Sequence, residues 1–142
     1  MLAELIARAR ELAERRAPAA SDPAVAVQCH GDPHADNALA VPSPRPGAGS
    51  GYVFVDPDGF PCEPAYDLGV TMRGWTSRVL SADDPVALTH DWSSRLANAT
   101  GLDDQAIWEW GLIQRVTTGL VLVRHGHGAE GRAFLASAER LA

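Results

Sequence analysis

The chain has 142 residues, of which 46% are hydrophobic and 21% are charged, so it is long enough for one domain with a buried core. The net charge is −6 and no basic cluster is present, which argues against nucleic acid as a partner. No apolar run approaches the roughly 18 residues of a membrane span, and the N-terminus lacks the apolar segment of a signal peptide. We therefore expect a cytoplasmic protein with no membrane partner.

The first third of the chain predicts one helix followed by short strands. Apolar residues recur at three- and four-residue spacing over 2–17, which indicates an amphipathic helix that Pro18 should end. Short strands are expected at 25–29, 38–41 and 52–56. Residues 42–51 are rich in proline, glycine and serine and predict a mobile surface loop. The last two strands should form a hairpin that brings residues 37 and 56 close together.

From Tyr66 onward the periodicity is helical. We predict helices at about 66–80, 85–99, 103–124 and 129–141, with N-caps at Asp83-Asp84 and Asp103-Asp104. His125 and His127 should lie at a helix end, and the four tryptophans should pack in the core. The predicted fold class is α+β, mostly α, with a small β-hairpin and a helical bundle.

Three polar residues have the spacing of a phosphoryl-transfer site. In kinase catalytic loops an Asp acts as base, and an Asn five residues later binds Mg²⁺. Asp32 and Asn37 have this spacing within HGDPHADN. A second metal ligand is an Asp at the end of a neighbouring strand, which Asp56 fits, and Pro57 should bias Asp56 towards extended backbone.

HGDPHADN and FVDPDGFPCEPAYDLG, in this order, resemble the two signature segments of the aminoglycoside phosphotransferase family. The likeness is greatest to its streptomycin and hydroxyurea kinase branch and covers residues 25–75. It implies a protein-kinase-like C-terminal lobe that uses ATP and Mg²⁺ to phosphorylate a hydroxyl group of an antibiotic, thereby conferring resistance.

The resemblance also implies roles for individual residues. Asp32 would be the catalytic base, Asn37 and Asp56 the Mg²⁺ ligands, and His30 and Asp67 the supports of the loop. His34 matches a motif position to which no role is assigned. Ala35-Asp36 departs from the Pro-Gly common in the family and adds a carboxylate beside the metal ligand.

A nucleotide-binding lobe needs a glycine-rich strand turn and a lysine that contacts the phosphates. All 12 basic residues of this chain are arginine, and only one helix is predicted before residue 25. We therefore interpret residues 1–142 as a single partial domain, the C-lobe without its N-lobe, with negligible kinase activity on its own. The surface left by the missing N-lobe should be apolar, near the first helix and the strand at 25–29, and could support self-association.

The substrate and two alternative functions follow from other features. An acidic chain suits a cationic acceptor, with candidate contacts in 83–109. These are Asp83, Asp84, Asp91, Asp103, Asp104 and Glu109.

The chain could instead be a non-catalytic lobe fragment. A metal-dependent hydrolase is the third hypothesis, because alternate residues of a strand share a face and His30, Asp32, His34 and Asp36 alternate. Cys29 and Cys62 lack zinc-site spacing and are expected to be buried thiols.

Overall fold

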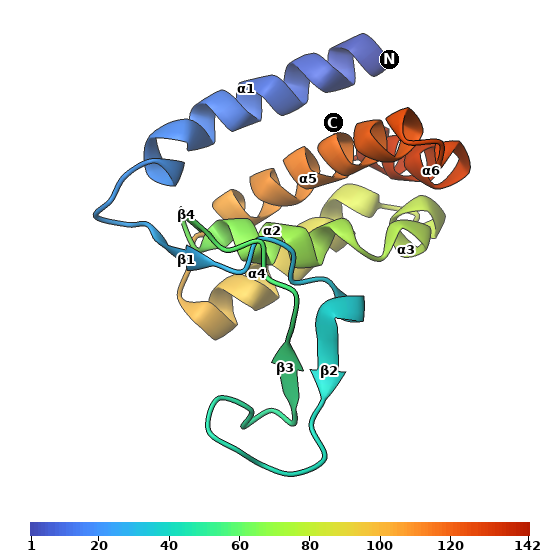
Figure 1. The fold of residues 1–142 in the computed structure, drawn as a ribbon. Coiled ribbons are helices and arrows are strands. Elements are labelled where there is room, and N and C mark those ends of the chain that lie inside the picture. The colour runs from blue at the N-terminus through green and yellow to red at the C-terminus, as the bar shows by residue number, and fades with distance from the viewer.

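The computed structural model describes residues 1–142 and is mostly helical, with four short strands (Figure 1). This confirms the predicted α+β class with a majority of helix. No helix is both long and apolar enough to cross a membrane. The helices are α1 (Leu2–Ala20), α2 (Ala65–Arg73), α3 (Thr76–Ser81), α4 (Pro85–Thr100), α5 (Asp104–Arg124) and α6 (Gly128–Glu139). The strands are β1 (Val27–Cys29), β2 (Ala38–Ala40), β3 (Tyr52–Phe54) and β4 (Phe60–Cys62), with a 3-10 turn at Ala35–Asn37.

Helix α5 forms the centre of the molecule and packs against α1, α2, α4 and α6. Its residues 106–116 are buried without interruption, as expected of a helix that is covered on every side. Gly69 of α2 lies so close to α5 that an added Cβ would be 2.3 Å from the Cβ of Trp110. A glycine at this position therefore allows α2, which begins within the second sequence motif, to lie directly on the core helix.

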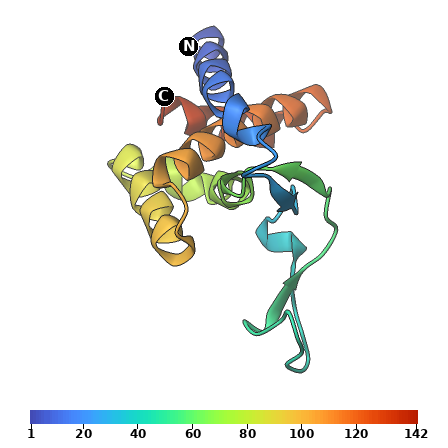
Figure 2. The ribbon, with the colours of Figure 1, turned by 90° about the vertical axis from the view of Figure 1, so that its left-hand side faces the viewer.

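The strands form two separate antiparallel pairs. β1 pairs with β4 beside the start of α2, and β2 pairs with β3 in a hairpin. This hairpin extends away from the helices in both views (Figures 1 and 2). Residues 42–51 connect its strands through tight turns, in which the amide of Ala48 donates to Arg45 O and the amide of Gly51 donates to Ala48 O. Ala48 is buried, which the prediction of a mobile surface loop did not include.

Two predicted boundaries were wrong. Helix α1 continues through Pro18 to Ala20, where the amide and hydroxyl of Ser21 both donate to Ala17 O and close the last turn. The helix predicted at 66–80 is two helices with a break at Gly74-Trp75. At the break, Trp75 has a left-handed φ of +54°, and the buried guanidinium of Arg115 binds the carbonyl oxygens of Met72 and Gly74. In a continuous helix Met72 O would instead accept from the amide of Thr76.

The N-caps follow the predicted positions. Asp84 accepts from the amide of Ala87 at 2.9 Å, and Asp103 accepts from the amide of Ala106 at 2.7 Å.

Strand β4 was not predicted, because Pro57, Asp58 and Gly59 indicated only a turn. After these residues the chain runs alongside β1, where Cys29 pairs with Phe60.

Candidate functional site

The loop after β1 is fixed by a carboxylate from the first turn of α2. Asp67 accepts hydrogen bonds from the backbone amides of His30, at 2.7 Å, and of Gly31, at 2.9 Å. Hydrogen bonds to a charged acceptor are short and strong compared with neutral ones. One side chain therefore ties the second sequence motif to the first and sets the position of the residue that follows, Asp32.

The imidazole of His30 holds the other side of this loop. Its Nε2 lies 2.9 Å from Val55 O, and its Nδ1 accepts from the amide of Asp32 at 3.2 Å. Since Nδ1 accepts, Nε2 carries the proton and donates to the carbonyl. Both ring nitrogens are thus engaged with backbone, which leaves His30 no lone pair for a metal ion.

Gly31 allows this loop to turn sharply. Its φ of +92° lies in the region that residues with a side chain rarely adopt. An added Cβ would also be 2.8 Å from the Cβ of Asp58 and 2.7 Å from the ring of Phe60. The close approach of the loop to the turn before β4 therefore requires a glycine here.

Asp32 follows this turn and is 30% exposed. Its Oδ1 forms an ion pair with Arg73 Nη2, and its Oδ2 lies 3.2 Å from His34 Nε2. Arg73, the last residue of α2, is 17% exposed and also faces Gln114 Oε1 at 3.5 Å. The carboxylate is thus partly open to solvent and oriented by two nitrogen-bearing side chains, of which sequence reasoning had identified only His34.

The expected metal ligands, Asn37 and Asp56, lie at the base of the hairpin. The amide of Val55 donates to Asn37 O at 2.9 Å, so Asp56 immediately follows the residue paired with Asn37. The Nδ2 of Asn37 donates to Asp32 O at 3.0 Å, which leaves Oδ1 of Asn37 available as a ligand. The carboxylate of Asp56 has no partner in the protein and is exposed. An amide oxygen and a free carboxylate fit Mg²⁺, which takes few protein ligands and completes its shell with phosphates and water.

The backbone of Asp56 differs from the expectation. Its φ is +58°, in the left-handed region, whereas the following Pro57 was taken to favour extended backbone. Aspartate tolerates this conformation better than most residues do. The difference arises at a bend, since Asp56 is the bent residue of the short segment between β3 and β4.

A hollow of about 330 Å³ lies beside Asp32. Its walls come from the loop after β1, the end of α2, the second half of α5 and the start of α6. The carboxylates of Asp36 and Glu130 border it, as do the hydroxyl of Thr118 and the ring of Phe134. The complete lining is His34, Ala35, Asp36, Arg73, Gly74, Thr118, Leu122, Glu130 and Phe134.

The acidic residues predicted at 83–109 do not border this hollow. Asp84 and Asp103 cap helices, Asp91 pairs with Arg95, and Asp104 accepts from Ser94. Glu109 is completely buried and binds Arg15 of α1 at 2.8 Å. The acidic residues that line this hollow are instead Asp36 and Glu130. Nothing in the sequence singled out Glu130, because its proximity depends on how α6 folds back onto α5.

The His/Asp alternation does not form a metal cluster. Residues 30–37 are a bend and a 3-10 turn, not a strand. His34 lies 3.2 Å from Asp32 and 3.9 Å from Asp36, but His30 is bound to backbone through both ring nitrogens. No group of three or more His, Cys, Asp or Glu side chains in residues 1–142 could hold a metal ion. The geometry thus removes the premise of the hydrolase hypothesis.

The cysteines, tryptophans and the His125/His127 pair were expected to have structural roles, and most of them do. Cys29 and Cys62 are free, buried thiols. Trp108 and Trp110 belong to the core, but Trp75 is 46% exposed and packs edge-to-face against Trp92. His125 and His127 lie at the end of α5 and the start of α6, as predicted.

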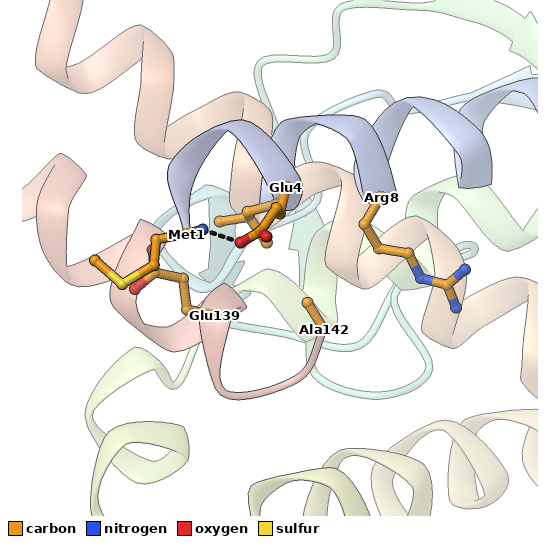
Figure 3. A pocket seen from close by; sticks show the side chains of 6 residues that line it. Met1, Glu4, Arg8, Glu139 and Ala142 are labelled. Carbon is orange, nitrogen blue, oxygen red and sulfur yellow. Dashed lines mark hydrogen bonds and ion pairs between the residues drawn. The ribbon is translucent and has the colours of Figure 1, made fainter.

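A separate hollow of about 440 Å³ lies between the two ends of the chain (Figure 3). Met1, together with Glu4 and Arg8 of α1, borders it opposite Glu139 and Ala142. Glu4 pairs with the terminal amino group in this view. The hollow shares no residue with the one beside Asp32, and none of the motif residues reaches it.

Comparison with known proteins gives no assignment: no protein-family model matches the chain, and neither a curated protein nor a solved structure shows a significant match.

Proposed function

We propose that this chain carries the catalytic half of a phosphotransferase that acts on a hydroxyl group. More specifically, we propose an ATP- and Mg²⁺-dependent kinase of the aminoglycoside phosphotransferase type, with streptomycin or hydroxyurea as the acceptor. The observation that carries the proposal is Asp32, which lies on a loop held by Asp67 and contacts His34 and Arg73, two residues that line the hollow. We also propose that the chain folds as a kinase-like lobe. In such a lobe the metal-binding Asn lies beside the catalytic loop, as Asn37 does here.

In the proposed reaction, Asp32 orients the acceptor hydroxyl and accepts its proton. The acceptor oxygen forms a bond to the γ-phosphorus of ATP, the bond from that phosphorus to the bridging oxygen breaks, and ADP leaves. Each carboxylate oxygen has two lone pairs, so Asp32 can accept from a hydroxyl while it stays bound to its neighbours. Asn37 Oδ1 and the Asp56 carboxylate would hold Mg²⁺, which neutralises charge on the phosphates.

The carboxylates around the hollow favour a cationic acceptor over a neutral one. Asp36 and Glu130 border the space beside Asp32, and Phe134 gives it an apolar wall. A guanidinium-bearing antibiotic such as streptomycin complements this arrangement, whereas hydroxyurea has no positive charge to pair with the carboxylates. The volume of about 330 Å³ lies at the small end of ligand pockets. Of the two acceptors, streptomycin is therefore the one that the charges support.

Binding of the acceptor can be tested on the chain itself by NMR titration. We expect streptomycin to shift the amide signals of Gly74, Thr118 and Glu130, and Glu130→Gln to weaken its binding. Asp104→Asn is the matched control, since Asp104 is an exposed acid outside the hollow. Shifts centred on Asp104, or equal affinity in Glu130→Gln, would contradict this acceptor site.

Catalysis needs a second test, because residues 1–142 contain no lysine and no glycine-rich strand turn for the phosphates. We expect negligible ATP turnover by these residues alone. When a nucleotide-binding lobe is supplied, Asp32→Asn should lower kcat by roughly 10²–10⁴, the usual contribution of a positioned general base. Bound transition metal together with hydrolysis that does not need ATP would instead favour the hydrolase. Streptomycin binding without any turnover under all conditions would favour a non-catalytic lobe.

A further inference from the structure

Arg73 has an environment that differs from those of the other paired arginines. Its Nη2 binds Asp32 Oδ1, while its Nη1 is 3.5 Å from Gln114 Oε1. A guanidinium has five N–H donors, and these are the two that have protein partners, so the remaining donors are free for a ligand. The side chain also borders the hollow beside Asp32. Arg73 is therefore a cation with unused donors at the proposed reaction centre.

The other arginines with defined partners are engaged away from this centre. Arg16 binds Glu63 through two hydrogen bonds, and Arg115 is buried among neutral acceptors. Arg78 lies over the ring of Trp92, and Arg140 binds carbonyl oxygens at the end of α3. None of these four borders the hollow beside Asp32.

Phosphoryl transfer requires positive charge beside the transferred group. Its transition state spreads negative charge over the equatorial oxygens, and preorganised donors that contact these oxygens supply much of the catalysis. This chain has no lysine to provide that charge. An arginine suits the task, since its planar fork binds two oxygens of a phosphate at once.

We propose that Arg73 binds the phosphoryl group during its transfer, so that this group and Asp32 share one guanidinium. The inference rests on the proposed function, since it assigns a cation to the same reaction centre. The bond changes are those described above: the acceptor proton goes to Asp32, and Arg73 exchanges hydrogen bonds without a covalent change. In the absence of phosphate, Arg73 holds the Asp32 carboxylate in an ion pair.

The competition between Asp32 and phosphate makes the proposal testable without turnover. The probe is inorganic phosphate, titrated into the 142-residue chain while the Nε–Hε signals of the arginine side chains are followed by NMR. We expect a saturable shift of the Arg73 signal. Asp32→Asn should tighten phosphate binding roughly two- to fivefold, which is the size of a partly exposed ion pair. If Arg73 served only to hold Asp32 in place, Asp32→Asn would bind phosphate no more tightly than the wild type does.

Two further variants complete the test. Arg73→Met should abolish the saturable binding, and Arg132→Met should leave it unchanged, because Arg132 is an exposed arginine of α6 that has no ion pair and does not border the hollow. If Arg73→Met fails to fold, the Arg73 signal in the wild type and in Asp32→Asn still decides the question. An Arg73 signal that does not respond to phosphate, or equal phosphate affinity in Arg73→Met, overturns the proposal. Streptomycin binding is measured separately, so such a result would leave the proposed acceptor site standing.

Discussion

Glu63 binds the guanidinium of Arg16 with both of its carboxylate oxygens, at 2.9 and 2.8 Å. Glu63 lies between β4 and α2, and Arg16 lies near the end of α1, so the pair fastens the first helix to the segment that leads into α2. Trp110 Nε1 also donates to Glu63, at 2.9 Å, and Arg16 lies 3.5 Å from the buried Glu109. A buried charge network thus connects α1 to the core beneath the candidate site.

We expect Arg16→Ala to destabilise the chain by about 3 kcal/mol or more. Removing one partner of a buried pair leaves the other charge uncompensated. Here Glu63, which is 6% exposed, loses the cation that it pairs with, whereas the buried Glu109 keeps Arg15. Urea denaturation followed by circular dichroism measures the difference. The control is Arg8→Ala, which breaks an exposed pair on the same helix and should cost less than about 1 kcal/mol. Equal effects of the two variants would contradict the network.

The second prediction concerns Asp67 and the loop that carries Asp32. Asp67→Ala removes the acceptor of two backbone amides, those of His30 and Gly31. Hydrogen bonds to charged groups contribute about 1.5–3 kcal/mol each. We therefore expect these two amides to lose protection against hydrogen exchange by at least tenfold. Asp36→Asn is the control, because the Asp36 side chain is 98% exposed. Unchanged exchange at Gly31 would mean that other contacts hold the loop.

A third prediction concerns the response of stability to alkaline pH. Burial raises the pKa of the Cys29 thiol to about 11, and the nearby Asp67 carboxylate adds to the effect. Between the unfolded value near 9 and about 11, the unfolded chain releases a proton that the folded chain keeps. Stability should therefore be unaffected by this thiol below about pH 9 and should fall as the pH rises towards 11.

Urea denaturation at pH 8, 9 and 10 can measure this fall. Cys29→Ala should make it shallower without removing it, because burial also raises the pKa values of Cys62 and Tyr66. The comparison uses the change with pH within each variant, so any loss of packing in Cys29→Ala cancels. An identical slope in the variant and the wild type would show that Cys29 does not govern it.

The sequence was sufficient for features that depend on local chemistry. Apolar periodicity predicted the helices around α1, α4, α5 and α6, and short acidic side chains indicated the caps at Asp84 and Asp103. The hairpin was also predicted, because two β-rich segments flank a loop of turn-forming residues. Each of these signals lies within a few residues of the structure that it specifies.

Features that depend on distant contacts were missed. At the break at Gly74-Trp75, the carbonyl oxygens of Met72 and Gly74 are bound by Arg115, about forty residues further on. Arg73 and Glu130 reach the surroundings of Asp32 only after α2, α5 and α6 have packed. The acids at 83–109 were chosen by charge alone, and their roles as caps and ion pairs depend on neighbours that a pattern does not reveal.

The last prediction concerns the apolar surface of the hairpin. Leu39 and Tyr52 are 50% and 57% exposed, and Val25 and Val27 near β1 are 47% and 45% exposed. β2 and β3 pair only with each other, so each strand has an unpaired edge that could accept a strand of a second chain. Apolar side chains beside open edges favour association. We therefore expect the apparent mass of the chain to rise with concentration in sedimentation velocity experiments.

The double variant Leu39→Ser/Tyr52→Ser should reduce this association and sediment as a monomer over the same concentrations. These two positions leave Phe54 intact, whose ring packs against His30 of the candidate site. The matched control is Val121→Ser/Val123→Ser, which removes two apolar side chains that are 55% and 42% exposed on α5, away from the hairpin. If the control variant lowers the apparent mass as much as the hairpin variant does, association depends on general surface hydrophobicity and not on the hairpin. If the wild type is monomeric at every concentration, the exposed edges do not pair in solution.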